Sequence, residues 1–139
     1  VKAKVSIPVI GNGDITNAQQ AFSVLQNTGV DAVMLGRAVQ GRPWLPADID
    51  RFLTTGLPPV ERSFETKCRA LARHVRALHL HYGPEQGLRI ARKHVGWFLQ
   101  ANTLDSEPFR QTFNLIQCDV QQLVFLDRLW NLGAVGAAA

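Results

Sequence analysis

The first third of the chain alternates short apolar runs with a helical pattern. Residues 5–10 and 30–35 are rich in β-branched and other apolar side chains, as the buried strands of a parallel sheet are. Between them, apolar residues recur every three or four positions from 18 to 25, and Thr16 and Gln19 have the spacing of a capping box. This order predicts a βαβ unit with two buried parallel strands and a right-handed crossover.

The next segment contains short helices and then a break. Residues 36–41 are typical of a short helical turn, and residues 43–53 predict a further helix with its apolar side chains facing inward. Two prolines and a glycine fall within residues 54–59, where they exclude a continuous helix. This segment is therefore the best candidate for a domain boundary.

The second half of the chain predicts helices only. Gly83-Pro84 ends one helix and begins the next, and a last pair is expected at 107–114 and 115–132. Such helices would form a small antiparallel bundle, so the predicted fold class is α/β followed by all-α. The residues expected on the apolar faces are Phe64, Cys68, Leu71, Val75, Leu78 and Tyr82 on the first helix, Leu88, Ala91, Val95, Phe98 and Leu99 on the second, and Phe109, Phe113, Ile116, Val120 and Leu123 on the last pair.

Positive charge is concentrated in one part of the chain. The formal net charge is +4, but residues 62–100 hold eight Lys and Arg against two acids, together with all four histidines. An excess of this size favours a polyanionic partner, because basic patches attract phosphate backbones at long range. A solvated helix face would have the same composition, so the charge alone leaves both interpretations open.

Glycines follow both predicted strands at the point where each strand ends. The loops are Gly11-Asn12-Gly13-Asp14 and Gly36-Arg37. In β/α barrels such neighbouring loops bind phosphate, since glycines admit the ligand to the backbone and the N–H groups that open a helix are partly positive. Arg37 would add a permanent cation. The alternative is that the glycines only shape tight turns. Asp14 would repel a phosphate, so it is expected to cap the following helix or to face a ribityl or ring group.

A second candidate site lies on the predicted helix after Pro84. Arg89, Arg92, Lys93 and Gly96 fall on one helical face, and Gly96 would leave that face open to a bulky ligand. Ile90, His94 and Trp97 border this face. Cations beside an aromatic edge suit RNA, whose phosphates need charge and whose unstacked bases need a flat partner. For Trp97 itself, packing in the core is the favoured interpretation.

The sequence does not predict a complete catalytic site. Cys68 and Cys118 are far apart without metal-ligand spacing, and free thiols in a reducing compartment are the favoured interpretation. The four histidines lack zinc-binding spacing, so no metal site is expected. No Walker loop, Rossmann glycine motif or nucleophile triad is recognisable.

Several motifs, taken together and in order, resemble the tRNA-dihydrouridine synthases, in particular their bacterial B-type branch. They cover most of residues 5–130. These motifs are Ile7-Pro8-Val9-Ile10-Gly11-Asn12-Gly13-Asp14-Ile15, Met34-Leu35-Gly36-Arg37-Ala38, Gln40-Gly41-Arg42-Pro43-Trp44, Tyr82-Gly83 and Arg92-Lys93-His94-Val95-Gly96-Trp97-Phe98.

The resemblance implies a TIM (β/α)8 barrel that binds FMN and is reduced by NADPH or NADH. Residues 1–57 would be the last βαβ portion of that barrel, residues 58–132 a helical tRNA-binding domain, and residues 133–139 a flexible tail. A cytoplasmic enzyme, monomeric at full length, is expected. The positions that match the family's FMN-binding residues are Asn12, Gly13, Asp14, Gly36 and Arg37, and those that match its tRNA-binding residues are Arg89, Arg92, Lys93 and His94.

The same resemblance places the family's catalytic cysteine outside this chain, because neither Cys68 nor Cys118 matches it. We therefore expect the chain to be a C-terminal part of a longer enzyme and to be inactive alone. Two other classes of protein remain as alternatives: a phosphate-binding barrel enzyme that acts on a small molecule, and a non-catalytic helical RNA-binding module.

Overall fold

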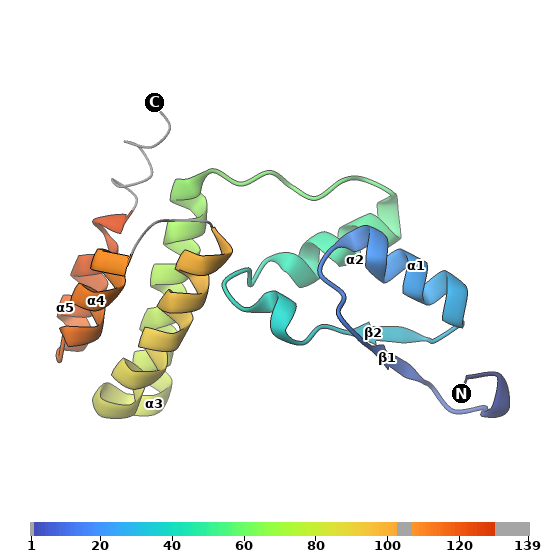
Figure 1. The fold of residues 1–139 in the computed structure, drawn as a ribbon, viewed down its shortest axis with the longest axis horizontal. Coiled ribbons are helices and arrows are strands. Elements are labelled where there is room, and N and C mark those ends of the chain that lie inside the picture. Colours follow the sequence, from blue (N-terminus) through green and yellow to red (C-terminus); the bar gives the residue numbers. More distant parts are fainter. Residues whose placement is uncertain (1, 103–106, 130–139) are drawn as a thin grey trace. The chain divides into compact units, whose positions relative to one another are not determined.

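The computed structural model describes residues 2–102 and 107–129, which form two compact units. The sheet unit comprises Val1–Glu61 and the helical unit Arg62–Ala139. Each unit is described by itself. Figure 1 follows the chain from the sheet unit in blue to the helical unit in green, yellow and red.

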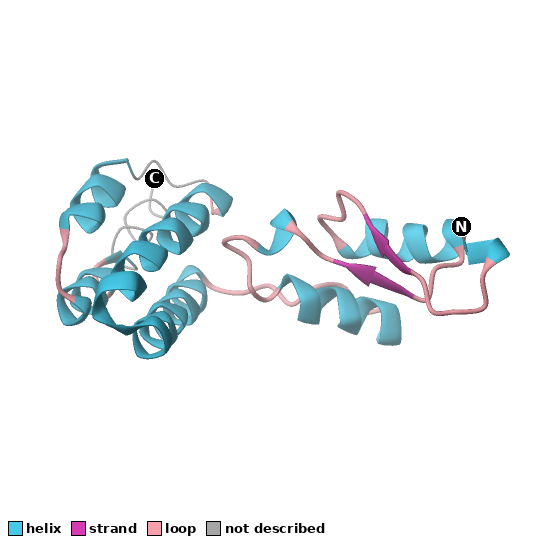
Figure 2. Ribbon diagram, turned by 90° about the horizontal axis from the view of Figure 1, so that it is seen from below, coloured by secondary structure: helices cyan, strands magenta, loops and turns pink. Residues whose placement is uncertain are grey.

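Two short parallel strands form the centre of the sheet unit. Strand β1 (Ile10–Asn12) pairs with β2 (Ala32–Met34), with Ile10 opposite Ala32 and Asn12 opposite Met34. Helix α1 (Ala18–Thr28) connects them, and Figure 2 shows the two strands side by side in magenta. The predicted βαβ order and the parallel pairing are confirmed, but the first strand was predicted at residues 5–10, and β1 instead includes Gly11 and Asn12. A 3-10 turn, η1 (Lys2–Lys4), precedes β1.

Helix α1 begins at a different residue from the one that the sequence indicated. Asn17 is the N-cap, and its side chain accepts a hydrogen bond from the Gln20 amide. The Gln20 side chain in turn accepts hydrogen bonds from the amide and the hydroxyl of Thr16. The predicted capping pair, Thr16 with Gln19, is therefore wrong by one residue. A cap at Thr16 or at Asn17 would satisfy free N–H groups at the start of the helix, so the sequence pattern does not distinguish the two.

The core of the sheet unit is small. After β2 come the 3-10 turn η2 (Arg37–Val39) and helix α2 (Leu45–Thr55), as predicted. Helix α2 ends at Gly56, whose positive φ of 70° favours glycine. The buried apolar residues that hold these elements together are Ile15, Ala18, Ala21, Leu45 and Ile49.

The prediction that both strands are buried is wrong for one face of the sheet. Gly11 and Val33 point toward the helices, where Val33 packs against the core. The opposite face is exposed, with Ile10 exposed by 64% and Met34 by 51%. A parallel sheet is usually covered on both faces, and the described helices of this unit cover only one.

The helical unit is built around a long helix that turns back on itself. Helix α3 (Phe64–Ala101) is interrupted at Gly83, whose φ of 76° and ψ of 173° are not helical, and Pro84 follows. We call residues 64–82 the first arm and residues 84–101 the second arm. The Phe64 and Phe98 rings, from opposite ends of α3, lie 6.4 Å apart, so the arms are antiparallel. The break predicted at Gly83-Pro84 is confirmed.

The two arms approach most closely near Gly87. A Cβ atom on Gly87 would lie 2.9 Å from the His79 Cα and 3.1 Å from the Leu78 carbonyl oxygen. Such distances are too short for any side chain, so glycine allows the two backbones to meet here. The sequence pattern did not predict this requirement.

Two further helices, α4 (Glu107–Leu115) and α5 (Asp119–Leu126), pack against α3. The Phe109 and Phe125 rings of these helices lie 4.6 Å apart. The largest fully buried apolar side chains of the described residues all belong to this unit: Phe98, Phe113, Leu99, Leu129, Val75 and Val95.

The predicted apolar face of α3 is correct except at Tyr82, the last residue of the first arm; on α5, Leu123 is half-buried but Val120 is not. Tyr82 is 43% exposed and Val120 is 62% exposed, although both were predicted to face the core. Gln122 and Leu126 are the buried residues of α5 instead. A loop at residues 116–118 separates α4 from α5, so the helical period restarts at Asp119. Residues 130–132, predicted to continue this helix, and the tail 133–139 lie outside the described residues.

Candidate functional site

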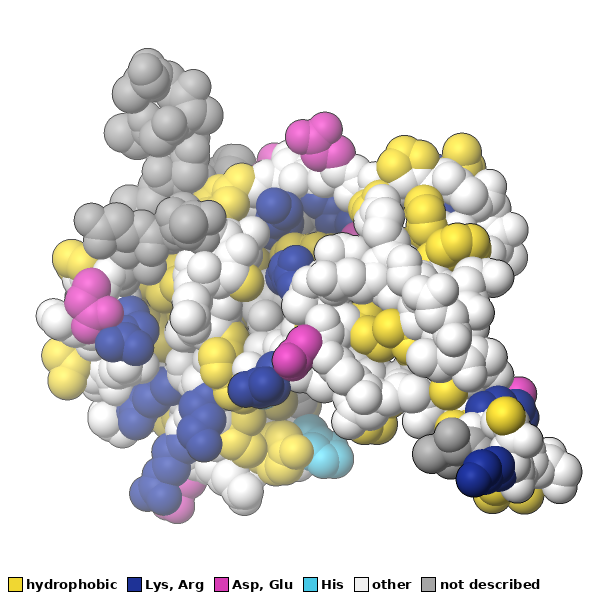
Figure 3. Space-filling view, turned by 45° about the vertical axis from the view of Figure 1, so that its right-hand side comes forward, with side chains coloured by type: hydrophobic (Ala, Val, Ile, Leu, Met, Phe, Trp, Pro, Cys, Tyr) yellow, Lys and Arg dark blue, Asp and Glu magenta, His cyan; other side chains and the backbone are white. Residues whose placement is uncertain are grey.

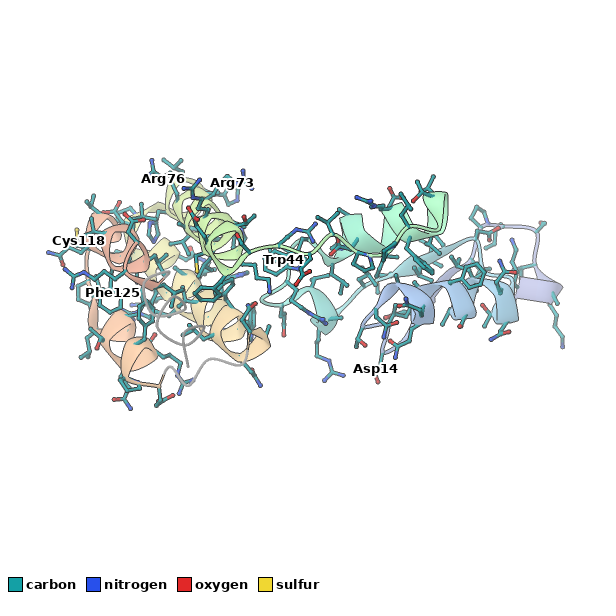
Figure 4. The ribbon with its side chains drawn as sticks, turned by 90° about the horizontal axis from the view of Figure 1, so that it is seen from above. Asp14, Trp44, Arg73, Arg76, Cys118 and Phe125 are labelled. Atoms are coloured by element: carbon teal, nitrogen blue, oxygen red, sulfur yellow. The ribbon has the colours of Figure 1, made fainter. Side chains whose placement is uncertain are left out.

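The glycine loops of the sheet unit lie at the same edge of the sheet. Because β1 and β2 are parallel and in register, both of their carboxyl ends reach this edge. The Arg37 guanidinium lies 3.4 Å from an Asp14 carboxylate oxygen, and both side chains are exposed. Asp14 and Arg37, 23 residues apart in the sequence, are therefore brought together, and Figure 4 labels Asp14 on this loop.

The space beside Gly13 and Gly36 is open. A Cβ atom on either residue would have no other atom within 4 Å, and neither has a left-handed φ. A positive φ therefore does not explain these two glycines. The loops also hold themselves in place, since the Ile15 amide donates to the Gly13 carbonyl at 2.8 Å and the Val39 amide donates to the Gly36 carbonyl at 3.3 Å.

The structure removes one of the two roles that the sequence left for Asp14. The cap of α1 is Asn17, and Asp14 pairs with Arg37 instead. The expectation that Asp14 caps the helix is therefore wrong. A contact with a sugar-like or ring group stays a prediction, as does the contact of Asn12 with a cofactor.

Only part of the predicted basic face of the second arm is exposed, because the rest packs against α4 and the loop that follows it. Arg89 and Lys93 are exposed, whereas Arg92 is half-buried and donates a hydrogen bond to the Ile116 carbonyl at 3.2 Å. The nearest atom to a Cβ on Gly96 is the Cδ of Arg110 in α4, at 3.9 Å. Gly96 thus faces α4, and the expectation that it opens the face to a bulky ligand is wrong.

His94 belongs to a cluster that the sequence did not predict. Its Nδ1 lies 3.0 Å from Nε2 of His74 on the first arm, and its ring lies 4.9 Å from the Trp97 ring. Burial lowers the pKa of His74 and of His94, and the neighbouring His74 lowers the pKa of His94 further. Both imidazoles are therefore neutral near pH 7. His74 and His94 are 20 residues apart, so only the turn at Gly83 could have indicated their meeting.

Further cations lie on the outer face of the first arm. Arg69 pairs with Glu65 at 2.5 Å, whereas Arg73 and Arg76 are exposed and make no ion pair with any described residue. Figure 4 shows the last two side chains pointing outward from the helix. Dark blue Lys and Arg side chains gather over the helical unit in Figure 3.

The cysteines are free thiols, as the sequence indicated. Cys68 is buried, and desolvation raises its pKa to about 11, so it stays protonated at neutral pH. Among the described residues, no group of three or more His, Cys, Asp and Glu side chains could hold a metal ion. None of the helices in the described ranges is long and apolar enough to cross a membrane.

A buried polar pair links the first arm to α5, and sequence reasoning missed it. His79 is 7% exposed and Gln122 is fully buried, and their side chains are joined by a hydrogen bond of 2.9 Å. Neither residue is among those expected on the apolar helix faces, because polar residues are rarely buried. The close approach at Gly87 places His79 in the interior, and Gln122 meets its ring there.

The comparisons with known proteins extend over nearly the whole chain. The family described as "Dihydrouridine synthase (Dus)" matches residues 1–132. The chain is 54% identical over 129 residues to tRNA-dihydrouridine synthase B of Salmonella typhimurium and of Escherichia coli strain K12, and 51% identical to that of Yersinia pestis. These matches cover 91% of this chain and 39% of each relative, so the chain spans about two fifths of their length.

Proposed function

Because this chain belongs to the dihydrouridine synthase family, we propose that its parent protein is a flavin-dependent tRNA-dihydrouridine synthase. The parent reduces uridine to dihydrouridine in tRNA with NADPH or NADH. In this proposal residues 1–57 are the last βαβ portion of a TIM barrel and residues 58–132 are the tRNA-binding domain. The target uridine has to leave the stacked tRNA fold to reach the flavin.

The observation that carries the proposal is the common edge of the two glycine loops. The open space beside Gly13 and Gly36, with the Arg37 guanidinium at the same edge, fits the phosphate of FMN. Backbone amides and Arg37 would hold that phosphate, while Asn12 and Asp14 would contact the more polar parts of the cofactor. Bound FMN supplies hydride transfer, which side chains cannot perform.

The helical unit would bind the tRNA. Arg89 and Lys93 are exposed and suited to phosphate contacts, and His94 lies beside them on the second arm. Arg92 has a weaker claim to direct contact, since its guanidinium already donates to the Ile116 carbonyl. Its Nε is buried, so only the terminal N–H groups of the guanidinium would contact tRNA, while Arg92 also fixes the loop between α4 and α5.

No catalytic residue is assigned to this chain. The proton that completes uridine reduction needs an accessible donor, and Cys68 is buried with a pKa of about 11. The chain spans only about two fifths of its relatives' length, and neither of its cysteines matches the family's catalytic cysteine. We therefore expect the chain alone neither to hold FMN tightly nor to reduce uridine. An absorbance titration tests this directly, and a yellow protein with one FMN per chain would overturn it.

A chimera tests the parent activity. This chain would replace the matching segment of the Salmonella typhimurium relative, and FMN content and dihydrouridine in tRNA would be measured. We expect an active flavoprotein, and Arg37→Ala should lower its FMN content while Arg51→Ala, an exposed arginine on α2, leaves it unchanged. Equal FMN content in both variants would remove Arg37 from the phosphate site.

Binding of a tRNA transcript tests the helical unit separately. The double variant Arg89→Glu/Lys93→Glu should weaken binding by the whole chain and reduce its dependence on salt by about one counterion per lost phosphate contact. Arg51→Glu is the matched charge reversal in the sheet unit. Salt-insensitive binding, or none at all, would favour the barrel enzyme that acts on a small molecule.

A further inference from the structure

One side of the helical hairpin carries the cluster of His74, His94 and Trp97, and the described parts of α4 and α5 lie on the other side. The side-chain hydrogen bonds from α3 to α5 and to the loop before it are made by His79 and Arg92. At 100° per residue, these lie about 140° and 160° around their arms from His74 and His94 respectively. No described residue of α4 or α5 hydrogen-bonds to the cluster or stacks on its rings.

Each histidine of the cluster has a ring nitrogen that is available for a hydrogen bond to a ligand. The contact between the two imidazoles uses Nε2 of His74 and Nδ1 of His94. The second nitrogen of each ring, Nδ1 of His74 and Nε2 of His94, has no hydrogen-bond partner among the described residues, and both rings are half-buried rather than enclosed. Both imidazoles are neutral near pH 7. Their shared hydrogen bond therefore leaves one nitrogen free as a donor and one free as an acceptor, without added charge.

Trp97 supplies the flat surface beside this pair. Its ring lies edge-to-face with His94, with an interplanar angle of 74°, and is half-buried. It is absent from the buried core, which Phe98 and Leu99 fill from the same turn of the helix. The sequence favoured a core position for Trp97, and the structure places it at the margin of the core instead.

Two cations border the cluster. Arg73 and Lys93 each precede one of the histidines, so they lie 100° around the helix on the outer flanks of the two arms. Both are exposed, and neither makes an ion pair with a described residue. A neutral, partly aromatic centre between two unpaired cations matches a nucleotide, whose base is flat and polar at its edge and whose flanking phosphates are anionic.

We propose that His74, His94 and Trp97 form a platform for one unstacked nucleotide of the bound RNA, with Arg73 and Lys93 contacting its flanking phosphates. The base packs against Trp97, and the free imidazole nitrogens bond to its edge. This assignment rests on the proposed function, since it presumes that the helical unit binds tRNA. It adds His74, Trp97 and Arg73 to that surface.

The experiment compares a short oligouridine with a blunt RNA duplex carrying the same number of phosphates, both added to the whole chain. Trp97→Leu keeps an apolar side chain but removes the ring, and His74→Leu removes the imidazole pair. We expect either change to weaken oligouridine binding about 5-fold or more and to alter duplex binding little, because stacking requires an unpaired base. Trp97→Phe should restore part of the loss. His81→Leu, an exposed histidine of the first arm, is the matched control.

A fluorescence measurement distinguishes direct contact between Trp97 and the RNA from an indirect effect of the substitutions on folding. In a Trp44→Phe/Trp130→Phe background, Trp97 is the sole indole, and oligouridine should quench its emission. Absence of quenching, unchanged oligouridine affinity in Trp97→Leu, or equal losses for both RNAs would each overturn the platform. If Arg89→Glu, which leaves every platform residue unchanged, weakens tRNA binding while Trp97→Leu and His74→Leu bind normally, only the platform fails. If none of these variants changes binding, the RNA-binding role fails as well.

Discussion

The two units of this chain bury their apolar residues in different ways. The helical unit encloses large side chains such as Phe98 and Phe113 among four helical segments. The sheet unit has a core of small and medium side chains, and it leaves Ile10 and Met34 exposed on the second face of its sheet. The comparison shows that the helices of one unit can enclose a core among themselves. A pair of parallel strands cannot, because it needs cover on both faces.

The largest expected effect is the loss of a ring from the helical core. Phe98 is 1% exposed and packs near Phe64. Phe98→Ala should lower the free energy of unfolding of the helical unit by about 3–5 kcal/mol, because it removes apolar burial and leaves a cavity. Urea denaturation followed by circular dichroism measures this. Leu80→Ala on the same helix is the control, since Leu80 is 83% exposed; a comparable loss there would show that the core has been misplaced.

The next prediction is that alanine has opposite effects on stability at two glycines of the second arm. Gly87→Ala should destabilise the helical unit by about 1–3 kcal/mol, because its new methyl group would overlap the backbone at His79. Gly96→Ala should stabilise it by up to about 1 kcal/mol, since a Cβ there has room and alanine favours helix. Thermal unfolding of the two variants gives the comparison. A stable Gly87→Ala protein would mean that the arms do not approach closely at this point.

A smaller effect should depend on pH. Burial lowers the pKa values of His74 and His94 below their ordinary 6.5, so the unfolded chain takes up protons first as the pH falls. The stability that these neutral rings contribute is complete above pH 6.5 and is lost as the pH falls toward their folded values. Hydrogen bonds to Arg110 and Gln111 lower the pKa of Glu107. Its protonation therefore changes the free energy of unfolding only below its ordinary pKa of 4.5, outside the range in which the histidines titrate.

Denaturation at several pH values between 7 and 5 therefore isolates the histidines. The free energy of unfolding should fall across this range in the wild-type chain and fall less in His74→Gln, which can still bond to His94. An identical slope in the two proteins would contradict the assignment of the pH dependence to this pair.

The smallest change in stability is expected on the open face of the sheet. Ile10→Thr should alter the unfolding free energy by no more than about 0.5 kcal/mol, since Ile10 is already exposed and threonine also favours strands. It should instead reduce self-association at high protein concentration, which sedimentation velocity measures, because it removes part of an exposed apolar surface. Val33→Thr is the inward-facing control and should lower stability.

Much of the fold follows from local sequence. The glycines after two apolar runs indicated the parallel pair, and Gly83-Pro84 indicated the hairpin of α3. Both signals act within a few residues, which is why they can be recognised from the sequence. The exposure of Ile10 could not be recognised, because an apolar run does not show whether a second layer covers it.

The candidate site was predicted less completely for a similar reason. The meeting of Asp14 with Arg37 follows from parallel strands, and placing both in the loops was possible from the sequence. The roles of Arg92 and of His74 depend on which helix faces which, through contacts with Ile116 and His94. Helical periodicity gives the faces of each helix but not the neighbour that each face meets.

The ion pair between Arg37 and Asp14 means that the loop edge carries its own counter-ion. An arriving anion does not meet a bare guanidinium; it exchanges with a carboxylate that is already there. Since the two side chains are 86% and 93% exposed, solvent screens their attraction, and giving it up costs no more than about 1 kcal/mol. The exchange therefore favours anions of higher charge over simple carboxylates of the kind that Asp14 itself provides.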